Sequence, residues 1–177
     1  MGPAEVLEAG PVTLRRWDPA WVEELDAVIR VSLPQLQQFM PWATAEHGLA
    51  ETRDYVTRSV AEWDSGESWN YAIFTATGEL VGSCGLMTRM GPGVLEIGYW
   101  VHSAHAGRGY ASAAAGALAE AGLRVPRIER VAIKHDAANP ASGRVAAKAG
   151  FTQVGRVETE PQGPGQTGAL LVWERHG

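Results

Sequence analysis

The ten residues from His102 to Ala111 read HSAHAGRGYA, and they decide which fold this chain can adopt. An apolar run from Val94 to Val101 precedes them and predicts a strand. An alanine-rich run from Ala111 to Gly122 follows them and predicts a helix. A glycine-containing turn between a strand and a helix leaves backbone N–H groups pointing outward, at the positive end of the helix dipole. We therefore expect an anion site at this turn, most often one for phosphate.

The composition is that of an ordinary folded chain, with 177 residues, 45% of them hydrophobic and 20% charged, and a net charge of -5. We expect one domain over residues 1–177, with residues 1–10 fraying. The acidic balance argues against a nucleic-acid partner. The single cysteine, Cys84, cannot form an internal disulfide, which fits a reducing compartment. No run resembles a signal peptide or a membrane span, so we expect a cytoplasmic protein without a membrane partner.

Apolar spacing and turn residues predict the remaining elements. The first half should contain a strand over 12–17, a helix from Asp18 to about Val31 that Pro34 ends, a short helix over 35–39 and a helix over 49–64. Strands over 69–75, 80–87 and 94–101 follow in quick succession and predict an antiparallel meander. After the alanine-rich helix we expect a strand over 131–133, a helix over 140–149 and strands over 151–157 and 169–173. The sequence thus predicts a mixed α/β fold.

Two common phosphate-binding motifs fit the glycine turn poorly. Gly107-Arg108-Gly109 after a strand is only a weak dinucleotide-binding signal. A dinucleotide turn normally follows the first strand of a parallel unit, whereas this one follows an antiparallel meander. No Gly-Lys-Ser/Thr follows, which excludes the phosphate loop of nucleotide triphosphatases.

Four runs of the sequence resemble the GNAT acetyltransferases. The run 100–111 resembles their acetyl-CoA loop, and 139–151, 96–100 and 36–42 are similar to the RimJ/RimL branch, bacterial enzymes that acetylate the N-termini of ribosomal proteins. The resemblance covers nearly the whole chain. It implies a central, mostly antiparallel twisted sheet that is flanked by helices and splays open at a slot beside the strand 94–101.

The resemblance also implies that the glycine turn holds the pyrophosphate of acetyl-CoA as co-substrate, with no metal. The backbone amides involved would be those around Ala106, Gly107, Gly109, Tyr110 and Ala111. Such loops usually begin with Arg or Gln, so Ala106 leaves the task to amides and the helix dipole. Arg108 adds charge there or is an ordinary surface arginine.

The strand 96–101 would line the pantetheine arm, and in the family it carries a bulge, to which Gly98 is suited. Amides near Tyr99 and Val101 would then hold the thioester carbonyl. By the same resemblance Asn139 contacts pantetheine, or only caps its helix.

Acetyl transfer to an amine proceeds by direct attack in a ternary complex and needs a base and, for the departing thiolate, an acid. The usual tyrosine acid is replaced by Ala146, so the resemblance points to Ser142 near the sulfur of CoA. Glu96 is the predicted base, because it is an acidic residue in an apolar strand. A salt-bridged Glu96 is the alternative, and His102, His105 and Asp136 are weaker candidates.

For the acceptor we expect aromatic walls, to which Trp42 and Tyr71 would contribute. The resemblance implies transfer of acetyl to a primary amine, foremost a protein N-terminal α-amine. Two alternatives stay open: a small-molecule amine such as an aminoglycoside, polyamine or amino acid, and a CoA-binding module without catalysis. A homodimer is compatible with either.

Overall fold

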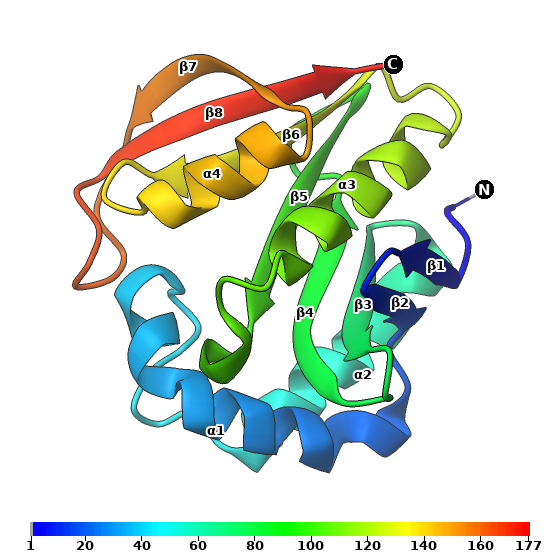
Figure 1. The fold of residues 1–177 in the computed structure, drawn as a ribbon, viewed down its shortest axis with the longest axis vertical. Coiled ribbons are helices and arrows are strands. Elements are labelled where there is room, and N and C mark those ends of the chain that lie inside the picture. The colour runs from blue at the N-terminus through cyan, green and yellow to red at the C-terminus, as the bar shows by residue number, and fades with distance from the viewer. Residues whose placement is uncertain (1) are drawn as a thin grey trace.

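The computed structural model describes residues 2–177 and contains one eight-stranded sheet flanked by helices (Figure 1). The strands are β1 (Val6–Ala9), β2 (Val12–Arg16), β3 (Ser68–Thr75), β4 (Leu80–Met87), β5 (Val94–Val101), β6 (Arg130–Asp136), β7 (Thr152–Glu158) and β8 (Ala169–His176). The helices are α1 (Val22–Phe39), α2 (Leu49–Ser65), α3 (Tyr110–Leu123) and α4 (Pro140–Lys148), with short 3-10 turns η1 (Pro19–Trp21) and η2 (Ser103–His105).

The strand order is β1-β2-β3-β4-β5-β6-β8-β7, and every neighbouring pair is antiparallel except β5 and β6. The expected meander and mostly antiparallel sheet are therefore confirmed. One core cluster joins the sheet to α3 and α4, and a second joins its opposite face to α1 and α2. The helices thus cover both faces of the sheet (Figure 1).

The sheet splits between β5 and β6. These parallel strands pair only where Val94–Glu96 lies beside Arg130–Ala132. Beyond Glu96, β5 stays paired with β4, while β6 stays paired with β8. The two halves of the sheet therefore diverge, and the expected splay beside the strand 94–101 is present.

The predicted bulge at Gly98 is wrong. The pairing of β4 with β5 runs without a register shift from Met87–Glu96 to Gly82–Val101, and Gly98 lies opposite Gly85. The register shift in this half of the sheet lies in β3, between Ile73 and Phe74. The slot opens because β6 leaves β5, and β5 itself needs no extra residue.

Two local predictions in the first half of the chain are also wrong. Pro34 does not end the first helix, which continues to Phe39 with the proline inside it. The buried stripe of α1 extends past the proline to Leu36, and this packing outweighs the hydrogen bond that Pro34 cannot donate. Residues 6–9, expected to fray, form β1 against β2. Met1, which that prediction includes, lies outside the described residues.

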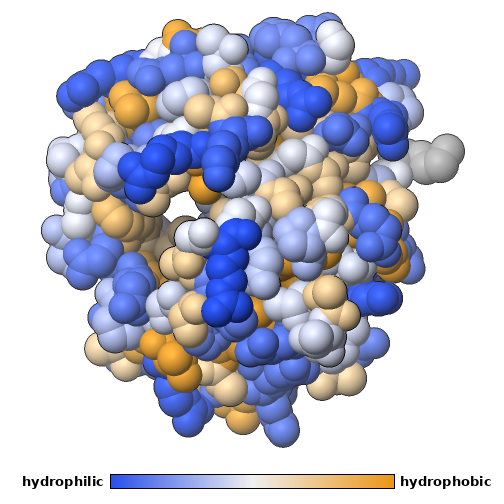
Figure 2. Space-filling view, in the orientation of Figure 1, coloured by the Kyte–Doolittle hydropathy of each residue, from blue (hydrophilic) through white to orange (hydrophobic). Residues whose placement is uncertain are grey.

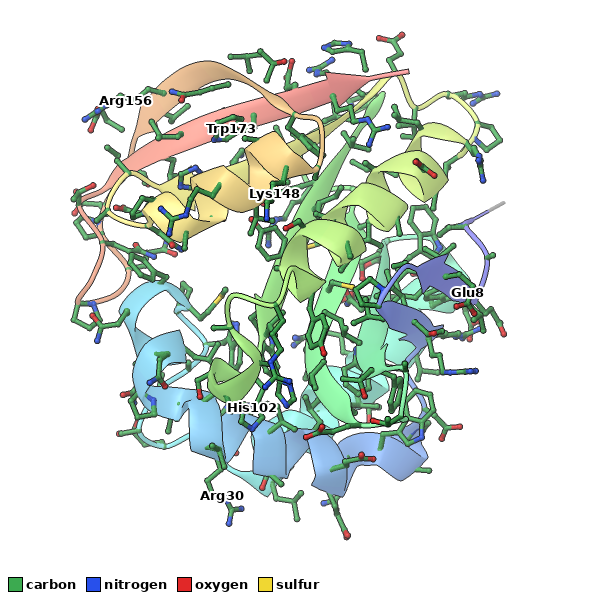
Figure 3. All side chains as sticks on the ribbon, viewed as in Figure 1. Glu8, Arg30, His102, Lys148, Arg156 and Trp173 are labelled. Atoms are coloured by element: carbon green, nitrogen blue, oxygen red, sulfur yellow. The ribbon has the colours of Figure 1, made fainter. Side chains whose placement is uncertain are left out.

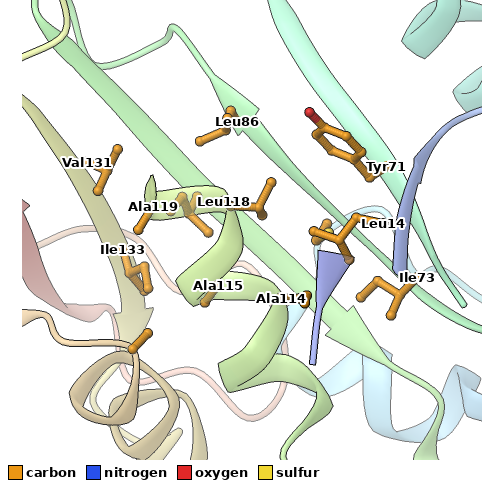
Figure 4. Packing of buried hydrophobic residues seen from close by; sticks show 14 of the residues in the cluster. Leu14, Tyr71, Ile73, Leu86, Ala114, Ala115, Leu118, Ala119, Val131 and Ile133 are labelled. Carbon is orange, nitrogen blue, oxygen red and sulfur yellow. The ribbon is translucent and has the colours of Figure 1, made fainter. Parts of the chain in front are cut away.

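Small side chains let α3 pack closely on the sheet. Ala114, Ala115 and Ala119 are fully buried against strands that include β6 (Figure 4). Near the end of α3, a Cβ on Gly122 would meet Val131 at 3.0 Å and Leu86 at 3.1 Å. The glycine therefore sets how near the helix axis can lie to β5 and β6.

Two glycine substitutions in α3 should change stability in opposite directions. Gly116→Ala adds a methyl group in open space, and we expect the free energy of unfolding to rise by about 0.5–1 kcal/mol through helix propensity. Gly122→Ala forces buried side chains apart, and we expect a loss of about 1 kcal/mol despite the same gain in propensity. Urea denaturation measures both. Equal stabilisation of the two variants would contradict the close packing.

Candidate active site

The glycine turn has the geometry of an anion cradle. Gly107 and Gly109 both have φ of +79°, a conformation that suits glycine, and a Cβ on either would meet nothing within 4 Å. Gly109 is the N-cap of α3, and no side chain in the described residues caps this helix end. The first amides of a 14-residue helix therefore face open space beside the turn. A negatively charged group would find hydrogen-bond donors and the positive end of the dipole there.

Arg108 is held by a short chain of polar contacts. Its Nη1 lies 3.3 Å from His105 Nδ1, and His105 Nε2 lies 3.3 Å from Glu79 Oε1. Because guanidinium only donates and carboxylate only accepts, His105 accepts at Nδ1 and carries its proton on Nε2. The His105 ring also stacks on Tyr110. This chain links the glycine turn to the start of β4.

The free edge of β5 presents backbone donors to the slot. His102 N donates to Val81 O on the β4 side. Successive residues of a strand alternate in the side toward which their N–H and C=O groups point. Tyr99 and Val101 stand at odd spacing from His102, so their amides point away from β4, toward the gap left by β6. This is the direction that binding of a carbonyl oxygen in the slot requires.

The surface is hollowed at the same place. Figure 2 shows an opening through the molecule between α4, the start of α3 and the end of α1. The side chain of Tyr99 packs with the α3 and α4 cluster, and that of Trp100 packs with the α1 and α2 cluster. The slot is therefore open toward both faces of the sheet.

Asn139 and Ser142 stand at the start of α4, on the side of the gap that faces β5. Asn139 Oδ1 accepts from Ser142 N at 3.4 Å, so Asn139 caps the helix. Ser142 Oγ lies 2.6 Å from the hydroxyl of Tyr99, across the gap between β6 and β5. Ala146, at the place of the usual tyrosine, is fully buried. Ser142 is therefore the hydroxyl that α4 brings to Tyr99.

Glu96 forms an ion pair. Its carboxylate is buried and accepts from Arg89 Nε at 2.8 Å and from Arg89 Nη2 at 2.9 Å. Glu96 is also the last residue of β5 that pairs with β6, so it stands where the slot closes. Proton acceptance would require breaking a two-point ion pair. The base role stays a prediction, and this geometry argues against it.

The weaker base candidates also have structural partners. His102 Nδ1 accepts from Ala104 N, and this hydrogen bond caps η2, which lies beside α1 (Figure 3). Asp136 is buried and accepts from Thr167 and Gly168, which fixes the loop before β8. Cys84 is buried as well, and burial raises the pKa of its thiol, which keeps it protonated.

The two predicted acceptor residues lie in different places. Trp42 is 38% exposed after α1, and its ring lies 6.0 Å from that of Trp100 and 5.4 Å from that of His47. Tyr71, in contrast, is fully buried in β3, and its hydroxyl donates to Ala4 O. β4 separates it from the slot. The prediction that Tyr71 contacts the acceptor is therefore wrong, and Trp100 stands beside Trp42 instead.

A clamp between the β7–β8 loop and α1 was not predicted from the sequence. Gly165 N donates to Gln38 O at 3.1 Å, and Gln166 Nε2 donates to Phe39 O at 2.9 Å. A Cβ on Gly163 would lie 2.8 Å from Gln38 O, so the contact is close. These residues are more than a hundred positions apart, and no local pattern reveals them. The clamp holds the β7–β8 loop beside the end of α1 (Figure 1).

A second undetected network fixes the segment after Trp42. Thr52 Oγ1 donates to the buried Asp26 carboxylate at 3.0 Å, so it must accept from His47 Nε2, also at 3.0 Å. Arg30, on the outer side of α1, pairs with Asp26 at 2.6 Å (Figure 3). The His47 ring therefore carries a proton on Nε2, and the network holds the ring against Trp42.

Residues 2–177 lack two further kinds of feature. No helix there is both long and apolar enough to cross a bilayer. No three His, Cys, Asp or Glu side chains there are grouped so that they could hold a metal ion.

Comparison with known proteins identifies the family. The family model of the GNAT acetyltransferase domain matches residues 12–152. The chain therefore belongs to the GNAT acetyltransferases. This is the family that the resemblance of the glycine turn implied.

The chain is also similar to particular proteins. The uncharacterized protein YkkB of Bacillus subtilis (strain 168) is 33% identical over 112 residues, which span 59% of this chain and 64% of YkkB, less than two thirds of its length. The structure of RimL, a ribosomal L7/L12 α-N-protein acetyltransferase, in complex with coenzyme A matches with a TM-score of 0.87 and 25% identity, covering 97% of this chain and 98% of that one. The microcin C7 self-immunity acetyltransferase MccE, in complex with acetyl-CoA and AMP, has a TM-score of 0.86 and 18% identity, covering 95% and 93%.

Acid should weaken the loop contact made by Asp136. Burial alone would raise the pKa of this carboxyl, but hydrogen bonds from Ala138, Thr167 and Gly168 outweigh burial and hold the pKa below its ordinary value. A lowered pKa contributes stability above the unfolded-state pKa of about 3.9, and that stability is lost as the pH falls through the folded-state pKa. Asp136→Asn should therefore be less stable than wild type by a constant amount above about pH 5, with the gap shrinking below about pH 4. Denaturation across this range tests it; a gap that widens in acid would refute it.

The variant Glu96→Gln distinguishes a structural role of Glu96, in its ion pair with Arg89, from a role as the catalytic base. Loss of the charged contact to Arg89, which is itself exposed, should lower the free energy of unfolding by about 1 kcal/mol. We expect kcat for acetyl transfer to change less than about threefold, whereas loss of a general base costs roughly a hundredfold or more. Glu174→Gln, which breaks the pair with Arg130, is the matched control. A folded Glu96→Gln enzyme with a hundredfold lower kcat would restore Glu96 as the base.

Proposed function

We propose that this protein transfers an acetyl group from acetyl-CoA to a primary amine, and that the preferred acceptor is a protein N-terminal α-amine. The observation that carries the proposal is the slot: β5 and β6 separate after Glu96, immediately beside the glycine turn that opens α3. A donor that has phosphate groups and a long thin arm requires an anion site for the phosphates and a narrow gap for the arm.

The donor half rests on the residues of the turn and the slot. The amides of Gly107, Gly109 and Tyr110 would hold the pyrophosphate, with Ala106, Arg108 and Ala111 around it. The arm would lie along the open edge of β5, where the Tyr99 and Val101 amides reach the thioester carbonyl. Asn139 and Ser142 would stand beside the sulfur. RimL, at 25% identity over nearly the whole chain, was solved with coenzyme A, which supports this choice of donor.

The chemistry is one displacement within a ternary complex. A neutral amine attacks the thioester carbon, the C–N bond forms, the C–S bond breaks, and the electron pair of that bond goes to sulfur. Amides of β5 stabilise the negative charge that grows on the carbonyl oxygen. The amine gives its proton to water, and the Ser142 hydroxyl donates to the departing sulfur. No enzyme nucleophile is needed, in keeping with the buried Cys84.

The acceptor half rests on the opposite mouth of the slot. The rings of Trp42 and Trp100 lie 6.0 Å apart, and Trp42 follows the end of α1, where Gln166 fastens the β7–β8 loop to Phe39. A mouth walled by aromatic rings and narrowed by a clamped loop suits a slender chain end that carries an amine. RimL acts on the α-amine of a ribosomal protein, which supports this class of acceptor.

An acceptor panel tests the proposal. Thiol release from acetyl-CoA is measured with peptides that begin with different residues, the same peptides blocked at the N-terminus, aminoglycosides, polyamines and free amino acids. We expect turnover with unblocked peptides only. Turnover confined to small amines would move the function to that class, and silence across the panel with CoA bound would favour a binding module.

A pair of glycine variants tests the donor site independently of turnover. Gly109→Ala places a side chain at positive φ in the cradle, and we expect the affinity for CoA to fall at least about tenfold. Gly10→Ala, at φ of +61° in the distant β1–β2 turn, carries a similar strain of about 1–2 kcal/mol and should leave the affinity unchanged. Calorimetry with CoA measures both. Tighter binding of NAD than of CoA would refute the donor.

A further inference from the structure

Tyr99 and Ser142 meet across the gap between the two halves of the sheet. Tyr99 is on β5 and Ser142 is on α4, which follows β6. The Tyr99 hydroxyl lies 2.6 Å from Ser142 Oγ and 3.3 Å from Ser142 O. These contacts lie beyond Glu96, where β5 and β6 share no ladder. A side-chain contact thus bridges the slot where its backbone pairing has ended.

Either hydroxyl group can be the donor in this hydrogen bond. The direction of the bond decides whether the Ser142 hydroxyl can donate to another group. If Ser142 donates to Tyr99, its proton is already used, and Tyr99 donates to Ser142 O. If Tyr99 donates to Ser142 Oγ, the serine proton is free to point elsewhere. A negatively charged sulfur beside Ser142 would favour the second arrangement, because hydrogen bonds to a charged acceptor are the stronger ones.

Tyr99 is suited to remain the donor of the pair. Burial raises the pKa of its hydroxyl, an effect that outweighs the opposing hydrogen bond with Ser142, so the phenol keeps its proton at neutral pH. Its ring is half-buried in the α3 and α4 cluster, which fixes where the hydroxyl lies. On α4, Ala146 is fully buried and has no polar side-chain group that could contact Ser142. The side-chain hydrogen bond that orients Ser142 Oγ therefore comes from Tyr99.

We propose that Tyr99 is a positioning residue whose hydroxyl donates to Ser142 Oγ and thereby turns the serine proton toward the leaving sulfur. The inference rests on the proposed function, since it assigns the sulfur of CoA to this place. In the transfer step the C–S electron pair goes to sulfur and the amine proton goes to water. Ser142 donates a hydrogen bond to the thiolate, and Tyr99 supplies the hydrogen bond that Ser142 Oγ accepts.

Kinetics of a double-mutant cycle test the inference. We expect Tyr99→Phe and Ser142→Ala each to lower kcat roughly tenfold or more, with the KM for acetyl-CoA within about twofold of wild type. The double variant should be no slower than Ser142→Ala alone, because Tyr99 acts through Ser142. Tyr71→Phe, which removes the hydrogen bond to Ala4 outside the slot, is the matched control and should keep its kcat.

A second readout needs no acceptor. The thiol of CoA is titrated in its complex with each variant by the ultraviolet absorbance of the thiolate. A hydrogen bond from Ser142 stabilises thiolate, so the pKa of the bound thiol should be lower in wild type than in Tyr99→Phe or Ser142→Ala, by about one pH unit. The Tyr71→Phe complex should titrate as wild type does.

The outcomes distinguish this inference from the proposed function. If wild type fails to bind CoA, both are overturned. If CoA binds but its thiol titrates identically in wild type and Tyr99→Phe, the positioning role is wrong and the donor assignment stands. Additive losses of kcat in the double variant would show that Tyr99 does not act through Ser142. If no acceptor in the panel is acetylated, the titration of the CoA thiol alone still decides whether Tyr99 positions Ser142.

Discussion

The early end of the ladder between β5 and β6 is the constraint on which the rest of this structure depends. Three residues of each strand pair in parallel, and then the halves of the sheet follow different partners. A sheet that stayed paired would leave no backbone donors free along β5 and no room beside Ser142. The glycine turn that opens α3 follows β5, so a turn with the geometry of an anion cradle and a narrow gap are combined along one strand.

Polar contacts support the divergence of the two strands on both faces of the sheet. On one face Tyr99 reaches Ser142 across the gap. On the other, the β7–β8 loop is fastened to the end of α1 through Gly165 and Gln166, and Asp136 fixes the base of the same loop. The Asp136 contact lies within the half of the sheet that holds β6 and β8. The other contacts join the two halves, or a helix on one half to a loop on the other, so the width of the slot is set by polar geometry as well as by core packing.

The sequence predicted what is local and missed what is distant. A strand, a glycine turn and a helix are encoded by neighbouring residues, so the cradle at Gly107 and Gly109 and the cap at Asn139 could be located in advance. The partner of Glu96 lies across a turn at Arg89, and that of Tyr71 lies 67 positions away at Ala4. A strand pattern indicates only that such side chains are near the core. The prediction that Pro34 ends the first helix was wrong for a related reason. Packing of the buried Leu36 outweighs the local tendency of proline to end a helix.

The slot open toward both faces has a consequence for how substrates come and go. The side chain of Tyr99 packs on the side of α3 and that of Trp100 packs on the side of α1 and α2, so under the proposed function donor and acceptor would approach the same carbon from opposite sides of one sheet. Neither has to leave for the other to arrive. The proposed function then predicts a sequential steady-state mechanism, in which spent coenzyme would compete with fresh donor at one entrance while the acetylated product would leave through the other.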